Sequence, residues 1–279
     1  MPLLVITILG AISYIRIPRV IPPVGEVSNP SLSGVLTSLR NLFVPLFEKK
    51  TDIKNNGQPL PILMYHYIRN NVDQTADPLG YGLSVTPAEF LQQLRYLSQN
   101  GYTTITMDQV AVGDYGDKAV ALTFDDGYKD FISEAYPLLE SYGFTATVYV
   151  ITNRLNDSRH LSEDDVVFLA NRGIAFGSHS VTHSNLARQS GADLRRELEV
   201  SKKTLSELID RPVTALSYPA GQYTDAVVDQ ARASGYTSAV TVVEGIADPS
   251  HDPFRLPRIR IRRDSSIKEF ARKLDPNRS

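Results

Sequence analysis

Two short segments of this chain carry the residue types that metal-assisted hydrolysis needs. Residues 123–128 read Thr-Phe-Asp-Asp-Gly-Tyr and end one apolar run, and residues 179–183 read His-Ser-Val-Thr-His and follow another. Three protein ligands and one open position suit a hydrolytic metal centre, because the open position can hold the attacking water. A further carboxylate that does not bind the metal can take the proton of that water. The two segments can therefore supply a metal site and a general base together.

Each segment also has an ordinary interpretation. Adjacent acids after a strand are often a helix cap and a solvated charge, and a surface His-x-x-x-His is common by chance. Here Asp125 and Asp126 emerge at the end of an apolar run, where neighbouring side chains point in different directions. His179 and His183 have the spacing that places two side chains on one face of a helical turn. The combination favours metal ligands, with one carboxylate binding the metal and the other facing the substrate.

Composition limits the alternatives. With 279 residues, of which 42% are hydrophobic, the chain can bury the core of one large α/β domain or of two small ones. A net charge of -2 gives no indication of a nucleic-acid partner. The absence of cysteine excludes disulfides, thiolate metal sites and a cysteine nucleophile, and no Gly-x-Ser-x-Gly elbow indicates a serine hydrolase. Any metal must be held by Asp, Glu and the five histidines, which are His66, His160, His179, His183 and His251.

The N-terminal segment leaves the location of the protein open. Residues 2–15 are mostly apolar but shorter than the ~20 residues that span a bilayer. No Lys or Arg precedes them, and Arg16 and Arg19 follow, which argues against export. The alternatives are an uncleaved anchor or atypical export signal, a buried element, or a misassigned start. We expect residues 1–24 to be this anchor or signal, 25–57 a linker with a short amphipathic helix, and 58–279 the main domain of an extracytoplasmic, anchored or secreted protein.

From residue 61 onward, predicted strands alternate with predicted helices. This alternation indicates a parallel sheet with helical crossovers, either open or closed into a barrel. Both chemical segments follow predicted strands, and parallel α/β folds build their sites at the carboxyl ends of strands. The predicted strands are 62–68, 119–124, 146–151, 174–176, 215–218 and 236–242, and the predicted helices are 86–100, 130–142, 164–171, 193–209 and 226–233.

The two motifs together resemble those of the polysaccharide deacetylases of carbohydrate esterase family 4, the NodB-homology domain. The resemblance extends from Gln58 to about Ser265. It implies an α/β fold, namely a distorted (β/α) barrel of the NodB-homology type. It also implies that Asp125 is the general base, and that the ligands of a divalent metal are Asp126, His179 and His183. Zinc is the default ion, although two histidines and one carboxylate also suit Fe, Co or Ni.

The chain departs from the third motif of that family, which usually reads Arg-x-Pro-Tyr-Gly. Residues 217–221 read Ser-Tyr-Pro-Ala-Gly, so Ser217 replaces the Arg and Ala220 replaces the Tyr. The backbone N–H of Ala220 can still hold the oxyanion. The Arg that orients the base in the family is missing. Arg258 or Arg260, in an alternating Arg-Ile-Arg-Ile segment, is the candidate to replace it, and the alternative for both is an exposed strand face.

The late motifs of the family are absent, and the chain contains no Trp. Residues 64–66, Met-Tyr-His, resemble instead a variant branch that includes poly-N-acetylglucosamine deacetylases, in which the motif order is permuted. His66 is therefore the candidate general acid, against the alternative of a histidine packed at a strand end. His160 and His251 lie in polar loops and are expected to be solvated.

The resemblance implies hydrolysis of N-acetyl groups on an N-acetylglucosamine polysaccharide that is poly-N-acetylglucosamine, peptidoglycan or chitin-like. Tyr67, Tyr128 and Tyr218 could form a sugar-stacking wall, or could simply be packed. The rival functions are a degenerate glycan-binding module, which would not need Asp125, and an O-acetyl esterase acting on xylan. The expected partner is an acetylated amino-sugar polysaccharide and not nucleic acid. The chain is expected to be a monomer with membrane association through its N-terminus.

Overall fold

The computed structural model describes residues 7–8, 11–12, 58–113, 115–263 and 265–275. The chain forms two units, Met1–Thr51 and Asp52–Ser279. In the first unit, β1 (Thr7–Ile8) pairs antiparallel with β2 (Ala11–Ile12). The predicted segment boundaries near residues 24 and 57, and the predicted linker helix, lie outside the described residues. Among the residues that are described, no helix is long and apolar enough to cross a membrane.

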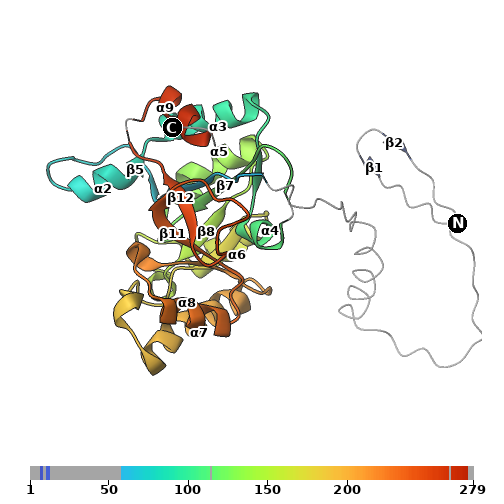
Figure 1. Ribbon diagram of the computed structural model, residues 1–279. Helices are drawn as coiled ribbons and strands as arrows, with labels where there is room; N and C mark the ends of the chain where they lie inside the picture. The colour runs from blue at the N-terminus through green and yellow to red at the C-terminus, as the bar shows by residue number, and fades with distance from the viewer. Residues whose placement is uncertain (1–6, 9–10, 13–57, 114, 264, 276–279) are drawn as a thin grey trace, which may run out of the picture. The chain divides into compact units, whose positions relative to one another are not determined.

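Seven parallel strands of the second unit close into a barrel (Figure 1). Such strands read as continuous apolar runs, because the core covers one face and helices cover the other. The closure confirms the expected distorted (β/α) barrel and excludes the open sheet. In ring order the strands are β3 (Ile62–Tyr65), β12 (Leu256–Arg260), β11 (Ser238–Glu244), β10 (Ala215–Ser217), β9 (Ala175–Ser178), β8 (Thr147–Val150) and β7 (Ala119–Phe124), which pairs with β3 again.

The predicted strand 62–68 is interrupted at His66. The chain leaves the barrel there and continues as β4 (Tyr67–Ile68), which pairs with β5 (Ser84–Val85). A further strand that the sequence analysis did not predict, β6 (Thr103–Ile105), pairs with the first half of β7. His66 therefore lies at the carboxyl edge of the barrel, level with the residue that follows β7.

Helices surround the barrel, with α3 and α9 packed together at one side and α7 and α8 at another (Figure 1). The first predicted helix, 86–100, begins with a capping box, in which Thr86 and Glu89 bond each other's backbone N–H groups. The described α-helices are α2 (Pro78–Leu83), α3 (Pro87–Gln99), α4 (Met107–Val112), α5 (Tyr136–Ser141), α6 (Glu163–Ala170), α7 (Gly191–Leu208), α8 (Asp225–Ala233) and α9 (Ile267–Leu274).

The single helix predicted over 130–142 is in fact two. A π-helical turn, Phe131–Ala135, precedes α5, and Pro137 lies in the first turn of α5 rather than at an internal kink. Proline is tolerated in a first turn because its missing N–H would have no helical partner there.

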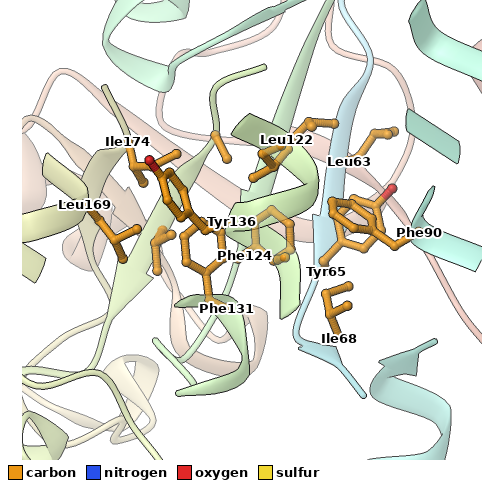
Figure 2. Packing of buried hydrophobic residues seen from close by; sticks show 14 of the residues in the cluster. Leu63, Tyr65, Ile68, Phe90, Leu122, Phe124, Phe131, Tyr136, Leu169 and Ile174 are labelled. Atoms are coloured by element: carbon orange, nitrogen blue, oxygen red, sulfur yellow. The ribbon is translucent and has the colours of Figure 1, made fainter. Parts of the chain in front are cut away.

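An aromatic cluster fixes the carboxyl ends of β3 and β7 (Figure 2). Phe124, the last residue of β7, stacks on Tyr65, the last residue of β3, with ring centroids 5.1 Å apart. Phe90 and Phe131 meet Phe124 edge-on at 5.8 and 4.8 Å. The Tyr65 hydroxyl donates to Gln93 Oε1 at 2.8 Å, so its buried polar atom is satisfied. This packing holds the two strand ends from which His66 and Asp125 project.

Candidate active site

A buried ion pair between Asp125 and Arg258 lies at the carboxyl end of the barrel. Asp125 follows β7, and Arg258 reaches it from β12. Arg258 Nη1 donates to Asp125 Oδ1 at 2.8 Å, and Arg258 Nη2 donates to Asp125 Oδ2 at 2.7 Å. Arg258 is fully buried and Asp125 is 3% exposed. The bidentate pair excludes the alternative of an exposed strand face for Arg258 and fixes the orientation of the carboxylate.

Arg258 uses all five of its N–H donors. The three donors that do not bond Asp125 go to Thr241 O at 2.8 Å, Thr123 Oγ1 at 3.0 Å and Ser217 Oγ at 3.2 Å. Ser217 is the residue that stands in place of the family's motif Arg. The serine side chain leaves room for a guanidinium from another strand and offers it an acceptor. The Arg258 guanidinium therefore lies where it neutralises the buried carboxylate of Asp125.

Electrostatics keep Asp125 ionised. Burial alone would raise the pKa of Asp125, but the charge and hydrogen bonds of Arg258 outweigh burial and hold this pKa well below its usual range. His66, which follows β3, shows the opposite balance, because burial lowers the pKa of its imidazole despite the nearby carboxylates of Asp125 and Asp126. Arg260 is half-buried, and burial lowers the pKa of its guanidinium.

Three further side chains converge beside this pair. Asp126 Oδ1 lies 3.4 Å from His179 Nε2 and 3.5 Å from His183 Nε2, and the three donor atoms all lie within 4.8 Å of one another. Ligands about 2.1 Å from a tetrahedral ion are about 3.4 Å apart, so these spacings fit a divalent metal. Burial lowers the pKa of the His179 imidazole less than the adjacent Asp126 and Asp125 raise it, so the net shift is upward. His183 shows the opposite shift, because burial and the neighbouring His179 lower the pKa of its imidazole.

A hydrogen bond and the shape of the loop orient the two histidines. His179 Nδ1 donates to Ser217 O at 2.8 Å, because a carbonyl oxygen can only accept, and this leaves Nε2, on the side of Asp126, available to bind a metal. Residues 179–183 do not form the predicted helical turn. Ser180 and His183 instead adopt left-handed φ values of 65° and 59°, and the loop turns the His183 ring back toward His179. Such conformations at non-glycine residues store backbone strain that the surrounding contacts must offset.

Glu197 of α7 supplies these contacts, and sequence reasoning did not identify it. The buried carboxylate accepts hydrogen bonds from the Val181 and Thr182 backbone N–H groups, each at 2.9 Å. It also accepts the Thr182 hydroxyl at 2.8 Å. In the sequence, nothing distinguishes Glu197 from an ordinary surface glutamate on a helix. Its role here becomes visible only when α7 is packed against the loop between His179 and His183.

Ala220 lies in the tight turn Pro219–Gly221 that follows β10. Its φ of 51° is left-handed, and the residue is exposed. Because β10 pairs with β9, whose end carries His179, this turn lies on the edge of the barrel that bears the site. Its position is compatible with the oxyanion donor that the motif suggested.

A cavity of about 250 Å³ adjoins Asp126 and His183. Tyr67 and Tyr128 line it and stack on each other with ring centroids 3.8 Å apart. Tyr218 is not part of this wall. It is fully buried, stacks on Tyr223 and donates its hydroxyl to Phe254 O at 3.0 Å. Tyr218 is therefore packed inside the protein, whereas Tyr67 and Tyr128 are accessible from the cavity.

His160 also differs from expectation. It is 7% exposed rather than solvated, and it lines the same cavity. Its ring stacks on Tyr128 with centroids 5.0 Å apart. A polar loop sequence gave no indication of this burial, which depends on the bridge between residues 128 and 160. His251 is partly exposed, near Asp248.

Comparison with known proteins identifies the family. The sequence profile of polysaccharide deacetylases matches residues 112–239. YxkH of Bacillus subtilis, which carries the name of a polysaccharide deacetylase, is 32% identical over 207 residues, covering 72% of this chain and 71% of YxkH. The chain belongs to the polysaccharide deacetylase family. This deacetylase is therefore a hydrolase, as the motifs predicted.

A solved structure and a further relative by sequence are also similar to this chain. The Streptococcus pyogenes deacetylase PplD, solved in complex with acetate, is 30% identical, with a TM-score of 0.75 over 79% of this chain and all of PplD. The poly-β-1,6-N-acetyl-D-glucosamine N-deacetylase of Staphylococcus epidermidis is 23% identical over 261 residues, covering 82% of this chain and 88% of that protein. The deacetylase thus resembles both relatives over most of its second unit.

Proposed function

We propose that this deacetylase hydrolyses N-acetyl groups of an N-acetylglucosamine polysaccharide with the help of a divalent metal. The observation that carries the proposal is the juxtaposition of an ionised, non-ligating Asp125 with the triad Asp126, His179 and His183. A glycan-binding module would have no use for a buried carboxylate held ionised beside three metal ligands. The names of the relatives, which include poly-N-acetylglucosamine deacetylases, support the choice of polymer.

In this proposal Asp126, His179 and His183 hold the ion, with zinc as the first choice and Fe, Co or Ni as alternatives. When bound, the metal would polarise the acetyl carbonyl and lower the pKa of the attacking water. Asp125 is always ionised near neutral pH and takes a proton from that water as its oxygen attacks the acetyl carbon. Because Arg258 binds both carboxylate oxygens, the base keeps one orientation through the reaction.

The remaining steps use two further residues. The backbone N–H of Ala220 donates a hydrogen bond to the oxyanion that forms when water adds to the carbonyl. The protonated form of His66 gives a proton to the amide nitrogen as the C–N bond breaks, which releases acetate and the free amine. Because burial lowers the pKa of His66, this step should slow as pH rises. The stacked Tyr67 and Tyr128 provide an apolar face against which a sugar ring can pack.

The test is acetate release together with metal content on the purified protein, using N-acetylglucosamine oligomers as substrate. Asp125→Asn should abolish acetate release while the bound metal persists, because Asp125 is not a ligand. Metal binding without acetate release from any glycan would instead support the binding module. Release only from acetylated xylan would support the esterase, and a protein that binds no metal would refute the proposal.

We also propose that the protein acts outside the cytoplasm, on the cell wall or on a secreted polymer, and is attached to the membrane through its N-terminal segment. The apolar residues 2–15 and the polymeric nature of the substrate support this location. Cell fractionation with protease treatment of intact cells tests it. Protection from protease in intact cells, together with cleavage after lysis, would contradict it.

A further inference from the structure

The cavity beside the metal triad carries an unusual charge for a site that would receive a neutral amino sugar. Besides Asp126 and His183, its lining includes two guanidinium groups, those of Arg154 and Arg159, and the imidazole of His160. The carboxylate of Asp126 is a proposed metal ligand, so its charge is offset by the ion. The Arg154 and Arg159 side chains are exposed to solvent, so an incoming ligand can reach their charges.

Arg154 and Arg159 have little compensation within the protein. Arg154 Nη1 lies 3.7 Å from Asp157 Oδ2, beyond hydrogen-bond distance. Across the described part of the chain, the guanidinium of Arg159 makes no hydrogen bond and no ion pair. Only the backbone of Arg159 is bonded, its N–H to Asp157 Oδ1 and its carbonyl to the Lys129 N–H. Two guanidinium groups thus share one distant carboxylate.

His160 provides an independent indication of a ligand. Its side chain is more than nine-tenths buried, and Nδ1 has no hydrogen-bond partner among the described residues. The nearest acidic atom, Asp157 Oδ1, is 3.7 Å away. A buried polar atom without a partner costs free energy unless a ligand or water satisfies it. His160 therefore adds a buried polar group without a protein partner to the lining that includes the two arginines.

We propose that this cavity is an anionic subsite, in which Arg154, Arg159 and His160 bind a carboxylate or phosphate group that the glycan carries close to the sugar being deacetylated. The inference rests on the proposed function and narrows it to an acidic polymer. Guanidinium groups are suited to such oxyanions because their planar N–H donors match the two oxygens. Exposed positive side chains at a cavity also raise its encounter rate with an anionic chain.

The experiment compares three oligomers of N-acetylglucosamine with the same backbone, which are unmodified, carboxymethylated and phosphorylated. The wild-type enzyme should have a higher kcat/KM for at least one acidic oligomer, and the better of the two acidic oligomers identifies the oxyanion. Arg159→Gln should reduce this acidic-over-neutral preference about threefold to tenfold, mainly through KM. Added salt should reduce it in the same direction. Arg195→Gln, a change at an exposed residue of α7 that does not line the cavity, is the matched control and should leave the preference unchanged.

Calorimetric binding of the same oligomers to chelator-treated protein separates the two proposals. If no glycan releases acetate but the acidic oligomers still bind more tightly, and Arg159→Gln removes that difference, the subsite stands and the proposed hydrolysis fails. Equal binding and equal kcat/KM for neutral and acidic oligomers would overturn the anionic subsite. An equal loss of kcat/KM on all three oligomers in Arg159→Gln would also overturn it.

Discussion

Replacing Arg258 by methionine removes the positive charge from the buried pair while keeping most of the side-chain volume. Asp125 then remains 3% exposed without its bidentate partner. Removing one member of a buried ion pair costs about 3–5 kcal/mol, because the other charge stays buried and unpaired. In a unit of this size each kcal/mol shifts Tm by about 2–4 °C. Arg258→Met should therefore lower Tm by roughly 6–20 °C.

The pH dependence of this loss follows from the pKa of Asp125. In the wild type that pKa is held well below its usual range, so the stabilisation is present above the unfolded-state pKa of about 3.9 and is lost only as pH falls below it. Without Arg258, burial raises the pKa. The folded variant then keeps a proton that the unfolded chain releases, and its stability falls as pH rises above about 4. The difference in Tm between wild type and variant should widen from pH 4 to pH 7.

Thermal unfolding of chelator-treated proteins at pH 4, 5, 6 and 7 measures this difference. Arg260→Met is the matched control, because Arg260 lies on the same strand but is half-buried and makes no bidentate pair, and it should change Tm far less. The double variant with Asp125→Asn should recover most of the loss, since both charges are then gone. A Tm difference between wild type and Arg258→Met that stays constant from pH 4 to pH 7 would refute the electrostatic reasoning.

Three further changes probe the site and its support. Burial raises the pKa of Asp130 to about 7, so the wild type loses stability as pH rises from about 4 to 7. In chemical denaturation, the free energy of unfolding of Asp130→Asn minus that of the wild type should increase by on the order of 3 kcal/mol from pH 5 to pH 8. The same difference at both pH values would contradict this. His183→Ala should lose the bound metal, as measured by elemental analysis, and full metal occupancy in this variant would exclude the triad as the metal site. Chelation of the wild type should stop acetate release. Gly177→Ala places a Cβ 2.5 Å from the Tyr149 ring and should lower the free energy of unfolding by about 1–3 kcal/mol. The control is Gly116→Ala, whose Cβ meets nothing within 4 Å and which should be close to neutral. Similar Tm values for both variants would show that the barrel relaxes.

The sequence was sufficient for those parts of the site that are contiguous in the chain. The strand 119–124 was predicted with its observed bounds, because a run of five apolar residues and one threonine leads directly into the Asp pair. The capping box at Thr86 and the placement of both motifs at strand ends follow from local rules of the same kind. The barrel itself was predicted from the family resemblance rather than from the pattern, which left an open sheet equally acceptable.

Features that depend on tertiary packing were not predicted. Periodicity suggested a helical turn for His179 and His183, but Glu197, which lies on a different element, holds that segment as a strained loop. The burial of His160 arises from its bridge to Tyr128. The sequence did offer Arg258 as a candidate, but it could not choose between an exposed strand face and a catalytic contact across 133 residues.

The position of Arg258 has a consequence for folding during synthesis. Asp125, the proposed general base, comes early in the chain, whereas the guanidinium that binds it comes on β12, which pairs with β3 in the ring. A nascent chain that has not yet emerged past residue 258 cannot assemble the site, however well its earlier strands have formed. Recovery of acetate release after denaturation should therefore report the completion of this long-range closure, a slow step in a fold of high contact order. The enzyme would remain inactive until its barrel is whole.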